Sequence, residues 1–109
     1  TMCAAIEEHV ISKGFTVVRE FVGHGAGRKL HESPQVPNYG RKGEKPRLRE
    51  GMILAIEPMV NEGTARVKVL SDKWTVVTMD RKPSAHFEHT VLVGKGKAEI
   101  LTPRPRLIF

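Results

Sequence analysis

A glycine-rich stretch in the first third of the chain constrains its fold more than any other feature. Residues 23–34 read GHGAGRKLHESP, and they contain His24 and His31 with no aliphatic run around them. Glycine permits sharp bends and lets a ligand approach the backbone closely. We therefore expect residues 23–40, which also contain prolines, to form a loop rather than a helix or a strand.

Short apolar segments flank this stretch and predict one helix and several strands. Residues 4–13 carry Ile6 and Val10 at helical spacing, and Gly14 follows at a position typical of a helix C-cap. The predicted strands are residues 15–22, 52–60, 65–70, 74–78, 85–93 and 98–101, and the tail at residues 102–109 is expected to be extended. Turn residues between the last two pairs of strands predict two hairpins. The sequence therefore predicts one α+β domain with a mainly antiparallel sheet.

The chain is basic, with a formal net charge of +6. Much of the excess lies in residues 41–49 and in Arg104 and Arg106. Such a patch can attract RNA or a membrane surface. No aromatic residues are interleaved with these charges, which weakens a nucleic-acid role and favours a solvated loop.

Composition also limits the location of the chain. No apolar run approaches the roughly 20 residues that cross a bilayer, so we expect no membrane partner. There is no signal-peptide pattern either. Cys3 is the single cysteine, so no intrachain disulfide is possible, which agrees with a reducing compartment and a cytoplasmic location.

Two glutamates stand in positions that call for a partner. Glu57 lies inside the apolar run at residues 52–60, where an unpaired charge would be unfavourable unless it is exposed or has a cationic partner. Strand alternation puts Glu88 on one face with His86 and Thr90, and this face is either solvated or part of a site. The same alternation puts His89 among apolar side chains, which is typical of a core histidine.

His24, Glu57 and Glu88 together offer nitrogen and oxygen ligands, which predicts metal-assisted hydrolysis. Such a set suits Mn, Fe, Co or Zn and selects poorly among them. His31 could be a second ligand, a proton donor or a hydrogen-bond donor to an oxyanion, and spacing does not choose between these roles. A pair of metal ions would need more acidic residues than these. Asp72, in a predicted hairpin turn, is typical of an ordinary turn residue, as is Asp80.

Other chemistries fit the sequence less well. Cys3 lies in the predicted helix with no nucleophile motif around it, and no Gly-x-Ser-x-Gly pattern occurs. The glycines of residues 23–27 lack the spacing of a dinucleotide-binding fingerprint. Neither a nucleophilic triad nor a dinucleotide site is therefore expected.

Four segments of the chain closely resemble the type I methionine aminopeptidases. They are residues 23–39, 51–61, 72–78 and 80–90, and they occur in the order of that family. The resemblance covers nearly the whole chain and implies removal of the initiator methionine from new polypeptides by a pair of divalent metal ions (Co, Mn, Fe or Zn). It also implies a pita-bread fold, with a curved antiparallel sheet and one or two helices in this part.

The resemblance assigns roles to individual residues. It implies that His24 and Glu57 bind one metal ion and that Glu88 bridges both ions. His31 would contact the substrate carbonyl group and stabilise the tetrahedral intermediate. Glu57 would also handle the proton of the attacking water, and Trp74 would border the methionine pocket, unless it is a core or surface tryptophan.

The family also has ligands that find no match in this chain. Two aspartates upstream of the histidine motif hold the second metal ion, and another upstream histidine helps to bind substrate. Residues 1–109 therefore resemble the C-terminal portion of the domain, with the upstream half absent. We expect the chain alone to be inactive or nearly so, as a fragment, an alternative product or one part of a split enzyme. It would pair with the missing half or with itself.

Two other functions stay open. A non-catalytic module could use the basic surface to bind RNA, and it could act at the ribosome beside emerging polypeptide N-termini. A dipeptidase of the same fold could cleave X-Pro bonds.

Overall fold

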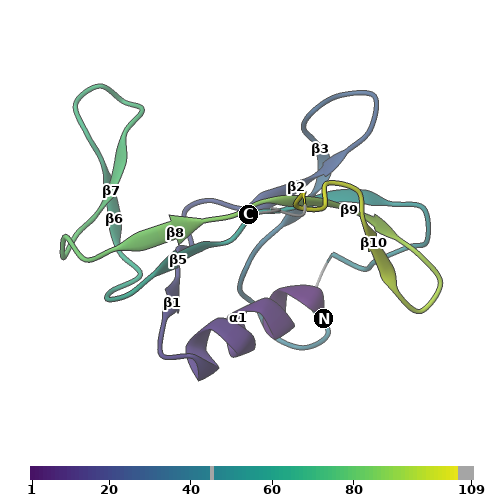
Figure 1. The fold of residues 1–109 in the computed structure, drawn as a ribbon, viewed down its shortest axis with the longest axis horizontal. Helices are drawn as coiled ribbons and strands as arrows, with labels where there is room; N and C mark the ends of the chain where they lie inside the picture. Colours follow the sequence, from purple (N-terminus) through teal and green to yellow (C-terminus); the bar gives the residue numbers. More distant parts are fainter. Residues whose placement is uncertain (45, 106–109) are drawn as a thin grey trace.

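The computed structural model describes residues 1–44 and 46–105. Within these residues the chain forms one helix and ten strands (Figure 1). The elements are α1 (Met2–Ser12), β1 (Thr16–Val17), β2 (Gly23–Ala26), β3 (Glu32–Val36), β4 (Ile53–Ile56), β5 (Met59–Asn61), β6 (Val67–Val69), β7 (Val76–Thr78), β8 (Ser84–His86), β9 (His89–Val93) and β10 (Ala98–Ile100). The α+β prediction is confirmed. Lys45 and residues 106–109, part of the predicted basic surface and tail, lie outside the described residues.

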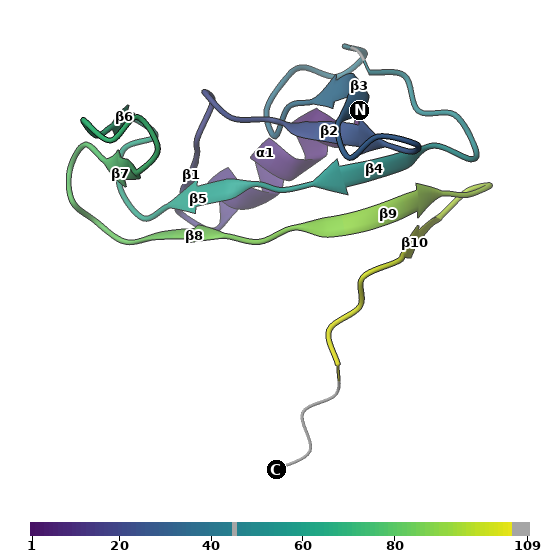
Figure 2. The same cartoon turned by 90° about the horizontal axis from the view of Figure 1, so that it is seen from above.

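All strand pairs are antiparallel and fall into three sheets. The largest has the order β10-β9-β4-β2-β3, a second has the order β1-β5-β8, and β6 pairs with β7 alone. Figure 2 shows β4 running on into β5, beside β9 and β8. The first two sheets are therefore two parts of one long surface, joined by two adjacent strands.

The junction between these sheets has one continuous register. Ile56 pairs with His89 on one side of it, and Met59 pairs with His86 on the other. Counting inward from both pairs sets Glu57 opposite Glu88. The predictions of single strands at 52–60 and 85–93 are therefore wrong in one respect, because both strands are interrupted for two residues at the same level.

The prediction of a loop over residues 23–40 is also wrong, because β2 and β3 lie within it. β2 is a central strand between β3 and β4. A Cβ atom on Gly23 would collide with the carbonyl oxygen of Ala55, and one on Gly25 with that of Ser33. Glycine is needed here because neighbouring backbones approach closely, and not because the chain bends.

The predicted helix is confirmed, and its ends differ little from expectation. Lys13 is the C-cap, and Gly14 follows with a φ of 85°, the left-handed conformation that glycine adopts at helix ends. Of the predicted strand at residues 15–22, only the two residues of β1 form a ladder.

One face of the long sheet carries the core. Val36, Leu54 and Val91 are buried there, with partly buried hydrophobic residues packed against them: Met2, Met52, Ile56 and Val93. Figure 1 shows α1 on this side of the sheet, while the β6–β7 hairpin and the end of the β2–β3 hairpin project on the other. His89 is not a core histidine, since it is half-buried and its Nδ1 lies 2.8 Å from the carbonyl oxygen of Thr102.

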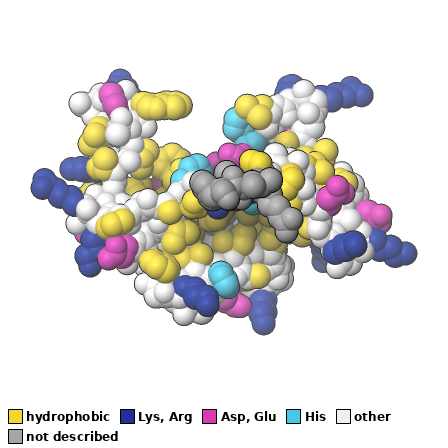
Figure 3. All heavy atoms as spheres, viewed as in Figure 1, with side chains coloured by type: hydrophobic (Ala, Val, Ile, Leu, Met, Phe, Trp, Pro, Cys, Tyr) yellow, Lys and Arg dark blue, Asp and Glu magenta, His cyan; other side chains and the backbone are white. Residues whose placement is uncertain are grey.

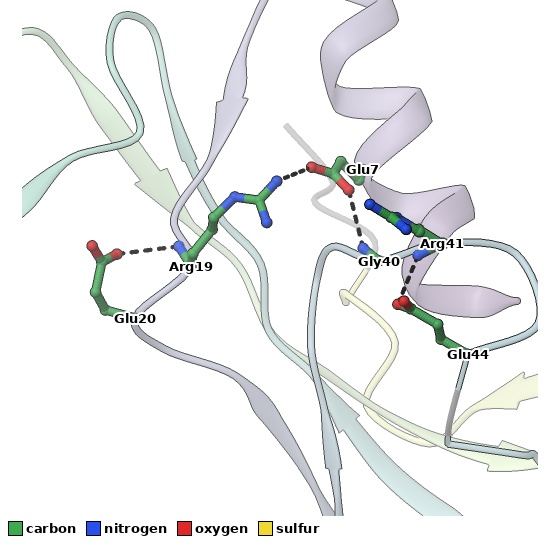
Figure 4. A network of polar contacts seen from close by, with 6 residues as sticks. All are labelled: Glu7, Arg19, Glu20, Gly40, Arg41 and Glu44. Atoms are coloured by element: carbon green, nitrogen blue, oxygen red, sulfur yellow. Dashed lines mark hydrogen bonds and ion pairs between the residues drawn. The ribbon is translucent and has the colours of Figure 1, made fainter.

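A polar network fastens α1 to the rest of the chain (Figure 4). Glu7 accepts a hydrogen bond from the Arg19 guanidinium at 2.6 Å and another from the Gly40 backbone N–H at 3.0 Å. One carboxylate on the helix therefore holds the segment that leads into β2 and the segment that follows β3. In the part of the chain that the structure describes, no helix is long and apolar enough to cross a membrane.

The β6–β7 turn supports a prediction about pH. The Asp72 carboxylate accepts hydrogen bonds from the Thr75 hydroxyl and from the backbone N–H groups of Thr75 and Trp74, and these bonds lower its pKa from the ordinary value of 3.8. The turn is therefore stabilised at neutral pH, and this stabilisation is lost as the pH falls through the lowered pKa. Trp74 is the single tryptophan, so its fluorescence should change in that acidic range. The Asp72→Asn variant should lack this transition; an identical transition in the variant would contradict the assignment.

Candidate metal centre

Three residues predicted from the sequence meet on the face of the sheet opposite α1. His24, Glu57 and Glu88 each offer one ligand atom, and these atoms all lie within 4.8 Å of one another. His24 pairs with Ala55, and side chains alternate along a strand, so Ala55 and Glu57 share the face that carries His24. The register across the junction adds Glu88 to the same face.

The ring of His24 is held in one orientation by the backbone. Its Nδ1 lies 2.9 Å from the carbonyl oxygen of Gly25. Because a carbonyl oxygen can only accept, Nδ1 carries the hydrogen, and in the neutral ring Nε2 presents a lone pair. This Nε2 lies 3.2 Å from Oε2 of Glu57. In that form two acceptor atoms face each other, an arrangement that a cation or a proton between them stabilises.

The environment of Glu57 favours a cation in the same way. Burial raises the pKa of its carboxyl group, and the negative charge of Glu88 raises it further, while His24 and His86 act in the opposite direction. Two carboxylates directly opposite each other, one of them partly buried, repel when both are ionised. A positive ion among them would remove this repulsion.

The three side chains fit one divalent cation. Ligand atoms on a cation such as Zn²⁺ lie about 2.0–2.2 Å from it, so neighbouring ligands are separated by roughly 3–4 Å, and the His24–Glu57 distance falls in this range. The combination of imidazole and carboxylate is typical of transition-metal sites. Among the described residues, no second group of three such side chains is found.

The structure places the other predicted site residues at different distances from this cluster. The His31 ring lies beside the His24 ring, with 4.0 Å between centroids, and its side chain is exposed. Trp74 is 86% exposed in the β6–β7 turn. Figure 3 shows histidine and acidic side chains gathered between the two projecting hairpins.

His86 is the residue whose part in the site the sequence left open. Its Nε2 lies 3.8 Å from Oε1 of Glu57. The alternation of residues 85–93 placed His86 on the face of Glu88, but gave no reason to prefer a site over solvent. The cross-strand register supplies that reason, since it sets His86 diagonally opposite Glu57.

Comparison with known proteins identifies the family. Residues 1–95 match metallopeptidase family M24, and the chain belongs to this family. It is 61% identical over 97 residues to a methionine aminopeptidase of Clostridium perfringens, which covers 89% of this chain and 39% of the relative. Methionine aminopeptidase 1 of Bacillus subtilis is 56% identical over 98 residues, which covers 90% of this chain and 40% of the relative.

A solved structure agrees with the sequence comparison. The crystal structure of methionine aminopeptidase from Thermotoga maritima superimposes with a TM-score of 0.89 at 57% identity, covering 94% of this chain and 41% of that one. The chain therefore spans about two fifths of the length of the relatives that it matches.

Proposed function

We propose that this chain carries part of the active site of a methionine aminopeptidase, which removes the initiator methionine from new polypeptides in the cytoplasm, beside the ribosome. The observation that carries the proposal is the cluster of His24, Glu57 and Glu88, with its ligand atoms within 4.8 Å of one another. The high identity to named methionine aminopeptidases supports the same activity.

In this proposal, His24 and Glu57 would hold one divalent cation, and Glu88 would supply a ligand to that cation and to a second one. Co, Mn, Fe and Zn all suit these ligands. A bound divalent cation supplies Lewis acidity and lowers the pKa of a bound water to about 7. The hydrogen bond from His24 Nδ1 to Gly25 keeps Nε2 directed at Glu57, so the ligand pair is oriented before any ion binds.

Glu57, together with two further side chains, also acts on the water and the substrate. Glu57 accepts the proton of the attacking water, because its carboxylate lies within the ligand cluster where that water would bind. His31 stands beside His24 and donates a hydrogen bond to the carbonyl oxygen as negative charge develops there. Trp74, at the end of the β6–β7 hairpin, borders the methionine pocket.

The chain supplies only part of such a centre. The described residues hold one group of three ligands, and two cations need more acidic groups than Glu57 and Glu88. We infer that residues 1–109 correspond to the C-terminal portion of the peptidase domain. The upstream portion, or a second polypeptide in its place, would provide the other ligands. The chain alone is then inactive or nearly so.

Reconstitution tests this function. The chain alone with Co²⁺ or Mn²⁺ should release no detectable methionine from a Met-Ala peptide. Mixed with the upstream portion of the Clostridium perfringens relative, it should release methionine, and the mixture with His24→Ala should not. A mixture that forms a complex by size-exclusion chromatography but cleaves X-Pro dipeptides and not Met-Ala peptides would contradict the proposal and favour a dipeptidase.

A further inference from the structure

The carboxylate of Glu57 lies between two imidazole rings. His24 Nε2 is 3.2 Å from Oε2, and His86 Nε2 is 3.8 Å from Oε1. Each ring therefore faces a different oxygen of the same group. His24 and Glu57 are both well shielded from solvent, whereas the His86 side chain is 43% exposed.

The register of the sheet junction brings His86 to this position. His86 is the last residue of β8 and pairs with Met59, the first residue of β5. Glu57 precedes Met59 by two residues, so it lies on the same face and diagonally opposite His86. The position of His86 is thus fixed by β5 and β8, independently of the β2 strand that carries His24.

The geometry places His86 outside the set of metal ligands. The atoms of His24, Glu57 and Glu88 lie within 4.8 Å of one another, but His86 does not join this group. Its neighbour is Oε1 of Glu57, whereas the neighbour of His24 is Oε2.

We propose that His86 is a positioning residue for Glu57: its Nε2–H donates to Oε1 and directs Oε2 toward the cation shared with His24. This inference rests on the proposed metal site. The separation of 3.8 Å exceeds a hydrogen bond by less than about 1 Å. The exposed His86 side chain closes it by a small rotation, since no other hydrogen bond or ion pair to a described residue holds the ring.

The role has a measurable consequence. A carboxylate that rotates freely is less well oriented toward an ion. A carboxylate held by a hydrogen bond to Oε1 keeps Oε2 directed at the ion. Partners of metal ligands typically change metal affinity by about 10–100-fold when removed. A glutamine at position 86 retains an N–H donor near Oε1, so it should replace most of the function of the imidazole.

Zinc affinity, measured on the 109-residue chain by competition with a chromophoric chelator, tests the proposal. His86→Ala should weaken Zn²⁺ binding about 10–100-fold, and His86→Gln should restore it to within about threefold of the original. His89→Gln is the matched control, because His89 lies on the opposite face and contacts Thr102. This variant should bind Zn²⁺ like the unchanged chain.

Two further measurements separate positioning from other roles. The Co²⁺ absorption bands of saturated His86→Ala should match those of the unchanged chain, because its ligands are the same; a changed band pattern would make His86 a ligand and overturn the proposal. Equal Zn²⁺ affinity with and without His86, in variants with equal urea unfolding curves, would also overturn it. If the unchanged chain binds Zn²⁺ no better than His24→Ala, the metal site itself is wrong, and the proposed function fails with it.

Discussion

Replacing Glu57 with glutamine should weaken metal binding strongly and, at the same time, stabilise the metal-free chain. Glutamine keeps the size of the side chain but removes its charge, so the partly buried repulsion with Glu88 disappears. The loss of an anionic ligand should weaken Zn²⁺ binding by more than about 100-fold, beyond the range for partners of ligands. Urea unfolding in the presence of a chelator measures the stability, and chelator competition measures the affinity.

The pH dependence of this effect follows from the raised pKa of Glu57. A carboxyl group whose pKa is higher in the folded state binds its proton more tightly there, so ionisation at neutral pH destabilises the fold. This destabilisation disappears as the pH falls through the folded pKa toward the ordinary value of 4.5. The stability difference between Glu57→Gln and the unchanged chain should therefore be largest at neutral pH and shrink on acidification.

A surface glutamate supplies the control for Glu57. Glu99 lies exposed on the edge strand β10, and Glu99→Gln should change neither Zn²⁺ affinity nor stability. Lower stability of Glu57→Gln than of the unchanged metal-free chain at neutral pH would refute the account of this carboxyl group.

Replacing Gly23 with alanine should destabilise the chain by about 3 kcal/mol, the upper part of the range for overpacked positions. The added methyl group would meet the carbonyl oxygens of Ala55 and Val36, which belong to the strands on either side of β2. Backbone atoms of paired strands cannot move aside singly, so the ladder itself must separate. Because His24 is the next residue, Zn²⁺ affinity should fall together with stability.

Gly96→Ala separates this effect from the general effect of adding a methyl group. Gly96 has open space around its Cα and a φ of 76°, so alanine there suffers only the backbone strain of about 1–2 kcal/mol. Zn²⁺ affinity should be unchanged in this control. If the Gly23→Ala variant were as stable as the Gly96→Ala variant, the predicted clash at Gly23 would be disproved.

The site was more predictable than the strand that carries it. His24 stood out because glycines leave it nothing to pack against, and Glu57 because an apolar run surrounds its charge. The structure brings both together with Glu88, and their roles as ligands stay predictions. β2 was missed because glycine is rare in strands. Only the closeness of the Ala55 and Ser33 carbonyl groups, which sequence does not reveal, explains why glycine is required there.

The alternation of side chains along residues 85–93 correctly predicted which residues share a face of the sheet. It did not predict where the strand pairing is interrupted. Glu88 and Thr90 do share a face, because the register continues across the interruption. The interruption itself leaves no sign in the polarity pattern. The contact of His86 with Glu57 depends on which residue of β5 pairs with it, and such pairing between distant segments is not encoded locally.

The paired interruptions at residues 57–58 and 87–88 make the junction between the two sheets a place where the strands are not held together by a ladder. On each side of this junction, ladders of hydrogen bonds stiffen the sheet. At the junction itself, the two sheets are linked by two strands that are not paired over these residues. Any bending of one sheet relative to the other is concentrated at this junction, where Glu57 faces Glu88. The distance between the two carboxylates is thus the distance in the site most sensitive to such bending. Any contact that fixes the two sheets relative to each other also fixes this distance.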